Sequence, residues 1–288
     1  MGIQSGQDGT FRILVIADPH TDQDEDANAR TWRDVHAMID RFRPGLLVVL
    51  GDVWCGDDRP EQAREWMRRD LSVIASLGVP WAFVWGNHDY GVDTADGHAA
   101  VATADNAVPP DVTGPPGDYR IAVADRHDDA VLWDLFFLNS HTECLLREDV
   151  EWLEQETMRL RAERGRDVPA LLFFHIPLKQ YETARETGRA EGIGLEEVLY
   201  WGDDGTLIEG IKRAGNVRAC FAGHSHRNDF YFVEDGVVFA YARATGYGGY
   251  GDDVKKGAKL ITLGPATLHF ETVFADGSTW GKIWNKLE

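Results

Sequence analysis

The chain has little lysine and few cysteines, and it contains no long apolar run. Only 7 of its 29 basic residues are lysines, and its formal net charge is −19. A surface of that sign repels nucleic-acid backbone and anionic membrane, which argues against a long nucleic acid or a membrane as partner. The cysteines Cys55, Cys144 and Cys220 are odd in number and widely spaced, which excludes a disulfide framework and a CxxC pair. No apolar stretch approaches the length of a membrane span.

The first residues also lack the apolar segment of a secretory signal. Together with the cysteine pattern, this leads us to expect a cytoplasmic protein. The 288 residues and the hydrophobic content of 43% are ample for a core. We expect a flexible lead-in over 1–10 and one domain over 11–288, because no linker divides the rest. The oligomeric state stays open.

Apolar periodicity predicts an α/β protein. Strands are expected near 11–17, 46–50, 81–85, 119–124, 131–138, 170–175, 217–222, 229–233, 237–242, 258–263 and 267–274. Helices are expected near 28–42, 60–77, 97–106, 147–164 and 205–214. The opening βαβαβ order implies a parallel sheet with right-handed crossovers. The strands after 217 are expected to form an antiparallel sheet.

Side chains that can bind metal follow five of these expected strands directly. They are Asp18 and His20, then Asp52, then Asn87, then His175, and finally His224 and His226. Five such coincidences, spread over 209 positions, indicate one site assembled from strand ends. The mixture of oxygen and imidazole donors without thiolate suits Mn²⁺, Fe or Zn²⁺.

Seven ligands are too many for one tetrahedral zinc ion, but they fit two metals that share Asp52. Such pairs sit about 3.5–4 Å apart and clamp the attacking and leaving oxygens of a displacement. The positive charge of two divalent cations is larger than the combined negative charge of Asp18, Asp52 and a bridging hydroxide. The residual positive charge attracts phosphate even within an acidic protein.

The blocks Asp18-x-His20, Gly51-Asp52, Gly86-Asn87-His88-Asp89, His175 and Gly223-His224-x-His226 resemble, in this order, those of the calcineurin-like metallophosphoesterases. The resemblance covers about positions 12–250 and implies a four-layer α/β/β/α sandwich of two mixed sheets. It implies a first metal held by Asp18, His20, Asp52 and His226. It implies a second metal held by Asp52, Asn87, His175 and His224. His88 would protonate the leaving group or bind phosphate, with a metal-bound hydroxide as nucleophile.

Two further motifs are His175-Ile-Pro-Leu with Tyr181, and the glycine-tyrosine segment 245–251. They resemble motifs of one branch of the family, which contains small plant purple-acid-phosphatase-like proteins and a fungal cell-cycle phosphatase. True purple acid phosphatases carry a glycine where this chain has His20 and a tyrosine where it has Cys55, so a tyrosinate–iron colour is not expected. Ser/Thr protein phosphatases carry an Asp-Arg pair where this chain has Cys55 and Gly56. The residue that orients His88 is therefore not identified.

The expected function is a metal-dependent phosphoesterase that hydrolyses a phosphomonoester or a small phosphodiester, so its partner is a small phosphorylated substrate. The alternatives are a nuclease and a non-catalytic metal-binding scaffold. Arg227, Arg243 and Tyr247 are the candidate substrate contacts, and Arg59, Lys179 and Tyr181 are weaker candidates of the same kind. Each arginine could equally be a surface charge. The segment 246–251, which holds Tyr247, is either a simple turn or a mobile loop that faces the substrate. Asp89 either supports the site or caps a turn.

Overall fold

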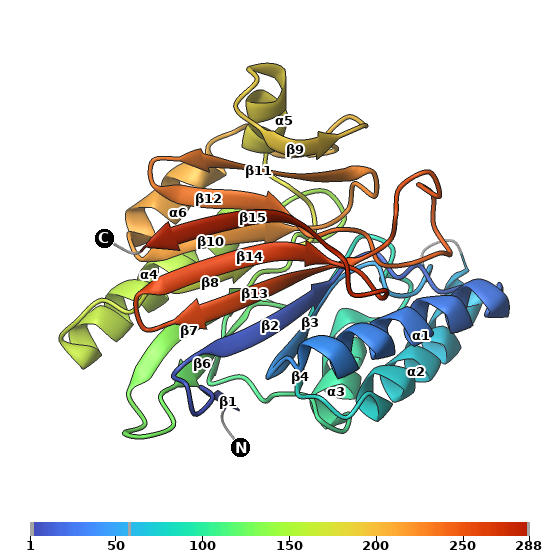
Figure 1. Cartoon of the computed structure of the whole chain (residues 1–288), viewed down its shortest axis with the longest axis horizontal. Coiled ribbons are helices and arrows are strands. Elements are labelled where there is room, and N and C mark those ends of the chain that lie inside the picture. The colour runs from blue at the N-terminus through green and yellow to red at the C-terminus, as the bar shows by residue number, and fades with distance from the viewer. Residues whose placement is uncertain (1–2, 57–58, 287–288) are drawn as a thin grey trace.

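Two β-sheets packed face to face form the centre of the molecule, and helices cover their outer faces (Figure 1). This is a computed structural model, and it describes residues 3–56 and 59–286. The layers follow the order α/β/β/α, so the predicted four-layer sandwich of two mixed sheets is confirmed.

The six-stranded sheet has the order β15-β14-β13-β2-β3-β4. Its parallel half contains β2 (Phe11–Ile16), β3 (Leu46–Leu50) and β4 (Trp81–Val84), connected by α1 (Glu25–Phe42) and α2 (Pro60–Ser76). The other half is antiparallel and contains β13 (Ala258–Gly264), β14 (Thr267–Val273) and β15 (Thr279–Lys286).

The nine-stranded sheet has the order β1-β6-β7-β8-β10-β12-β11-β9, with β5 paired to β6. Its strands are β1 (Ile3–Gln4), β5 (Val112–Thr113), β6 (Tyr119–Ala124), β7 (Val131–Phe137), β8 (Ala170–Phe173), β9 (Glu191–Gly194), β10 (Val217–Ala222), β11 (Asn228–Glu234) and β12 (Val237–Tyr241). The four central strands, β7, β8, β10 and β12, run parallel. The remaining helices are α3 (Thr94–Thr103), α4 (Arg147–Arg164), α5 (Lys179–Glu186) and α6 (Leu207–Ala214).

Alternation along the central strands separates the core into layers. In β3, Val48 and Leu50 face the other sheet, whereas Leu47 and Val49 face the helical layer that contains α1 and α2. Because successive strand side chains point to opposite faces, a strand covered on both sides must be apolar throughout. All five residues of β3 are buried, which explains the continuous apolar runs in the sequence.

Both ends of the chain contain strands that pair with distant segments. Within the lead-in over 1–10, β1 pairs with β6 and Ile3 is buried in the core between the sheets, and the flexibility of this segment stays a prediction. The strands after 217 do not form one antiparallel sheet: β10 and β12 are parallel neighbours in one sheet, while β13 and β14 extend the other. Apolar alternation identifies a strand, but the choice of sheet depends on contacts with distant segments.

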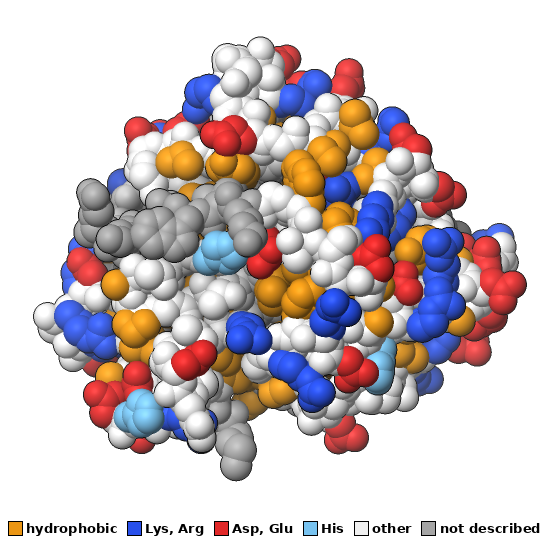
Figure 2. Space-filling model, in the orientation of Figure 1, with side chains coloured by type: hydrophobic (Ala, Val, Ile, Leu, Met, Phe, Trp, Pro, Cys, Tyr) orange, Lys and Arg blue, Asp and Glu red, His pale blue; other side chains and the backbone are white. Residues whose placement is uncertain are grey.

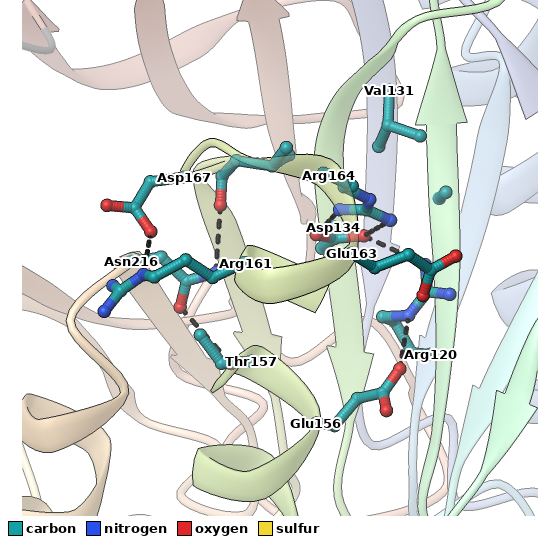
Figure 3. A network of polar contacts seen from close by, with 12 residues as sticks. Arg120, Val131, Asp134, Glu156, Thr157, Arg161, Glu163, Arg164, Asp167 and Asn216 are labelled. Carbon is teal, nitrogen blue, oxygen red and sulfur yellow. Dashed lines mark hydrogen bonds and ion pairs between the residues drawn. The ribbon is translucent and has the colours of Figure 1, made fainter. Parts of the chain in front are cut away.

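A network of charged side chains holds α4 against the nine-stranded sheet (Figure 3). Asp134 on β7 accepts hydrogen bonds from Arg120 Nη1 at 2.9 Å and from Arg164 Nη1 at 2.6 Å. Arg120 also lies 3.4 Å from Glu156 on α4. Asp134, Arg120 and Glu156 are all buried, and a buried charge is tolerated only when it is paired.

On the outside, basic and acidic side chains are interspersed over the face in Figure 2. Across residues 3–56 and 59–286, no helix combines the length and apolarity that crossing a membrane requires.

Candidate metal centre

The site lies where strands of both sheets end. β2 and β3 lead into Asp18, His20 and Asp52, and β8 and β10 lead into the histidines of the other sheet. Asp18, His20 and His226 form one group of buried metal-binding side chains, and Asp52, His175 and His224 form a second. Within each group the potential ligand atoms lie within 4.8 Å of one another. The structure thus gathers six of the seven expected metal ligands into two groups.

Asp52 lies between the two groups. Its Oδ2 atom is 3.4 Å from His20 Nε2 in the first group and 3.0 Å from His175 Nε2 in the second. His226 Nε2 in turn lies 3.1 Å from His20 Nε2. A carboxylate in this position can contact a cation in either group, which is the geometry that a shared ligand requires.

Four of these residues have a left-handed backbone. The φ angles are 54° at Asp18, 46° at His20, 53° at Asp52 and 75° at His224. Non-glycine residues rarely adopt such angles, and they persist only where the surrounding structure enforces them. Gly51 precedes Asp52 at φ +81°, and a Cβ there would lie 2.7 Å from His175 Nδ1. The glycine is therefore needed for the approach of the two sheets at this point.

Several buried atoms of the site are left without a hydrogen bond. Asn87 Oδ1, His175 Nε2, His224 Nδ1 and His224 Nε2 have no hydrogen-bond partner among the described residues. His175 Nε2 is close to Asp52 Oδ2 but not aligned for a hydrogen bond. A buried polar atom in this state costs about 1–3 kcal/mol. Coordination of a cation would satisfy these atoms, so the residues fit a metal site, and the assignment of Asn87 to the second group stays a prediction.

The histidine tautomer supports the same interpretation. His175 Nδ1 lies 2.8 Å from the backbone carbonyl oxygen of Leu50. A carbonyl can only accept, so Nδ1 carries a proton, and Nε2 is the ring atom that can bind a cation once it is deprotonated. Hydrogen bonds of this kind orient metal-ligating histidines and set their tautomer.

The carboxylates make the centre attractive to positive charge. Burial lowers the pKa of His175, but Asp52 and Asp18 raise it by more, to about 9. Burial raises the pKa of Asp52, yet His175 and His20 bring it well below its usual value. Burial and the charge of His175 lower the pKa of His224 to about 3. The apo cluster therefore holds a proton on His175 that a bound cation would displace.

His88 stands beside the ligand groups. Its ring centroid is 5.1 Å from that of His20, and its backbone N–H donates to Asp52 Oδ1 at 2.8 Å. The side chain is half-buried and lines the same cavity as Asp52 and His224. His88 thus reaches the space in front of both groups, as a residue that acts on a bound substrate must.

The cavity above the two groups has a volume of about 470 Å³. Besides metal-binding residues and His88, its walls include Gln23, Arg59, Trp66, Leu199, Trp201 and Tyr250. A space of this size is typical of sites for small molecules. Of the three weaker candidates, Arg59 lies on the wall. Tyr181 is buried, with its hydroxyl 3.3 Å from the backbone oxygen of Ala240, and Lys179 Nζ donates to the backbone oxygen of Asp204.

The three expected substrate contacts lie elsewhere. Arg227 pairs with Asp253, at 2.5 Å between Nη2 and Oδ2. Arg243 is buried, with Nε 3.0 Å from Asp229 Oδ2. The Tyr247 hydroxyl donates to Asp34 on α1 at 2.8 Å. None of the three lines the cavity, and each side chain meets a carboxylate instead. Their role as substrate contacts stays a prediction.

The glycine-tyrosine loop is closely packed. A Cβ on Gly248 would lie 1.9 Å from the backbone oxygen of His20, and one on Gly249 would lie 2.6 Å from His226 Cε1. The glycines therefore allow the loop to lie directly on the ligand-bearing turns. The tyrosine that faces the cavity is Tyr250, which stacks on His226 at 4.0 Å between ring centroids.

Comparisons with known proteins agree with this geometry. The family model for calcineurin-like phosphoesterases matches residues 11–228. The chain is 27% identical to a probable inactive purple acid phosphatase 28 of Arabidopsis thaliana, over 85% of this chain and 72% of that protein. It is 24% identical to the phosphatase DCR2 of Saccharomyces cerevisiae, over 81% of this chain but about half (47%) of the yeast protein.

The fold is similar to a dimetal phosphatase from Danio rerio, with a TM-score of 0.68 and 12% identity over 96% of this chain and 99% of the other. The family model spans the greater part of the sequence and includes every strand end that carries a metal-binding side chain. The chain belongs to the calcineurin-like phosphoesterases.

Proposed function

We propose that the chain is an active metal-dependent hydrolase of small phosphate esters, either monoesters or small diesters. The observation that carries this proposal is the complete pair of ligand groups with Asp52 between them. Asp18, His20, Asp52 and His226 would hold one ion, and Asp52, Asn87, His175 and His224 the other. Two ions of Mn, Fe or Zn, when bound, polarise phosphoryl oxygens and activate water.

His88 is the residue that we assign to proton transfer. It lies outside both ligand groups but lines the cavity in front of them. From there it can give a proton to the oxygen of the departing alcohol, a contribution of about 10²–10⁴-fold in rate. The hydrogen bond from its backbone to Asp52 fixes its position relative to the shared carboxylate.

The cavity and the charge favour small substrates over polymers. A volume of about 470 Å³ accommodates a small organic phosphate. The net charge of −19 disfavours the nuclease alternative, because binding of long nucleic acid depends on basic side chains. Failure to cleave single-stranded DNA under conditions that support hydrolysis of small esters would exclude nuclease activity.

A non-catalytic metal-binding scaffold is the second candidate. The word "inactive" in the name of the Arabidopsis relative favours it. The presence of His88 and all seven ligand residues in this chain favours catalysis.

Hydrolysis of p-nitrophenyl phosphate and of bis(p-nitrophenyl) phosphate, after chelation and restoration of Mn²⁺, distinguishes the candidates. We expect turnover that depends on the metal and that is lost in the Asp52→Ala and His175→Ala proteins. The matched controls are Asp40→Ala and His36→Ala, which alter an exposed pair on α1. Normal turnover by both site variants would refute the proposal, and intact metal content without turnover of either ester would favour the scaffold.

A further inference from the structure

Two exposed aromatic rings stand beside the ligand groups, one next to each. The Trp201 ring lies 4.8 Å from that of His224 in the second group, at an interplanar angle of 83°. Tyr250 stacks on His226 in the first group. Trp201 is 52% exposed and Tyr250 is 47% exposed. Large apolar surface left open inside a cavity, rather than scattered singly, marks a binding site.

The two rings belong to segments that are fastened to each other. The Tyr250 hydroxyl donates to Glu196 Oε1 at 3.0 Å, and the backbone N–H of Arg227 donates to the same oxygen at 2.8 Å. Asn228 Oδ1 accepts the backbone N–H of Leu195 at 3.0 Å. The segment that leads to Trp201 is thus connected to both Tyr250 and the turn after β10. A rim held in this way binds a rigid ligand with little loss of conformational entropy.

The exposed surfaces of these rings are flat aromatic faces and edges, unlike the aliphatic surface of a general apolar pocket. One face of Tyr250 rests on His226, so its exposed area belongs to the opposite face and the ring edge. Trp66 and Leu199 lie on the same cavity wall, and Gln23 adds a polar group. Flat π-surfaces with a few polar neighbours suit a ligand that is itself flat and has polar edges.

We propose that the preferred substrates are phosphate esters whose alcohol carries a planar aromatic ring. The phosphate would lie at the two ligand groups, and the ring would contact Trp201 and Tyr250. This inference rests on the proposed hydrolase function and names the substrate class of the same site. Stacking of a base on an aromatic side chain contributes enough to change affinity by roughly 5- to 150-fold.

The test compares esters with the same leaving oxygen. Adenosine 5′-monophosphate and ribose 5-phosphate differ by the base alone, and benzyl phosphate and cyclohexylmethyl phosphate differ by the flatness of the ring. We expect kcat/KM of the Mn²⁺-restored protein to favour the aromatic member of at least one pair by about tenfold. Preference in the first pair only indicates a nucleoside, and preference in the second indicates any aromatic alcohol.

Variants connect that preference to the named rings. Trp201→Leu should reduce the ratio of the two kcat/KM values toward one, and Trp201→Phe should restore part of it. Trp280→Leu is the matched control, because Trp280 is an exposed tryptophan (38%) that is not part of the cavity wall. Ratios near one in both pairs, or a Trp201→Leu protein with the full preference, would overturn the inference. Absence of turnover on all four esters and on p-nitrophenyl phosphate would instead overturn the proposed function on which it rests.

Discussion

Asp89 holds the backbone of Asp52 in place. Asp89 Oδ2 accepts the N–H of Asp52 at 2.8 Å, and Oδ1 accepts those of Val53 at 2.7 Å and Trp54 at 3.2 Å. Asp89 Oδ2 also accepts the N–H of Gly86 at 2.9 Å. The sequence left Asp89 open between a capping and a supporting role. The structure shows that this carboxylate joins the turn after β3 to the turn after β4.

Replacing Asp89 should therefore damage the metal centre without removing a ligand. An Asn side chain presents an NH₂ group to N–H donors, so Asp89→Asn leaves at least one donor unpaired. We expect metal affinity to fall by about 10- to 100-fold, as for other groups that orient metal ligands. Isothermal titration with Mn²⁺ measures this change. An affinity equal to that of the unaltered protein would show that the turn keeps its shape without the carboxylate.

Loss of His88 should separate metal binding from catalysis. His88→Ala keeps all seven ligand residues, so the metal content by elemental analysis should stay the same. Turnover of an ester with a poor leaving group should fall by about 10²–10⁴-fold, because the proton donor is missing. Esters with a good leaving group, such as p-nitrophenyl phosphate, should lose less. A variant that lost metal and activity in parallel would instead assign His88 a structural role.

Removal of metal should destabilise the fold. The carboxylates Asp18 and Asp52 are buried with no basic residue other than histidine within ion-pairing distance among the described residues. A cation that binds the folded state alone stabilises it by about 2.7 kcal/mol at a hundredfold excess over its Kd. We expect the Tm to fall on treatment with a chelator and to recover with Mn²⁺. The Tm of Asp52→Ala should respond much less to either addition.

The buried charge network around Asp134 (Figure 3) should matter more to stability than a nearby exposed ion pair. Asp134→Ala leaves the buried Arg120 and the largely buried Arg164 without this partner, at a cost of about 3 kcal/mol in the free energy of unfolding. Asp167→Ala removes only the exposed partner of Arg161 and should cost less than about 1 kcal/mol. Urea unfolding of the two variants gives the comparison, and equal losses would contradict it.

The carboxyl group of Asp118 should make stability fall as pH rises. Burial and the charge of Asp149 raise the pKa of Asp118 from 3.8 to about 9. The folded state therefore holds a proton that the unfolded chain has released. The contribution of this proton to the free energy of unfolding is complete below the pKa that Asp118 has in the unfolded chain. It is lost as pH rises through the pKa of Asp118 in the folded protein, by at most about 1.4 kcal/mol per pH unit.

Asp118→Asn removes that dependence, because an amide does not titrate in this range. In the unaltered protein the backbone N–H of Asn139 donates to Asp118 Oδ1 at 2.7 Å. The amide oxygen of the Asn side chain can accept the same hydrogen bond. We expect urea midpoints of the variant to decline less than those of the unaltered protein between about pH 5 and about pH 8, both measured with a chelator present. Parallel declines would mean that Asp118 is ionised in the folded state.

The sequence predicted helices and strands well wherever the signal is local. The strand at 46–50 and the helix at 147–164 have the predicted bounds, because apolar periodicity and turn residues mark them. His175 and His224 each lie two residues past the end of their strands, β8 and β10, so the order of blocks along the chain was sufficient to predict that they lie close together. The family and the fold that followed from those blocks are confirmed.

The sequence says least about contacts between distant segments. Tyr247 binds Asp34, 213 residues away, and Arg243 meets Asp229 between the sheets. Trp201 forms part of the cavity wall, yet it follows no motif and no strand end. No local sequence pattern predicts these long-range contacts, since they depend on how loops of both sheets pack together. The residues that line the sides of the cavity were therefore less predictable from the sequence than the metal-binding residues at its base.

Each group of metal-binding side chains takes residues from both sheets. Asp18 and His20 follow a strand of the six-stranded sheet and His226 follows one of the nine-stranded sheet; Asp52 meets His175 and His224 in the same way. A cation in either group would act as a reversible crosslink between the two sheets, in addition to their apolar core and to polar contacts such as that between Lys259 on β13 and Asp229 on β11. A substitution far from the site that lets one sheet shift relative to the other would then lower the rate of catalysis. The amount of bound metal would measure whether the two sheets keep their relative position.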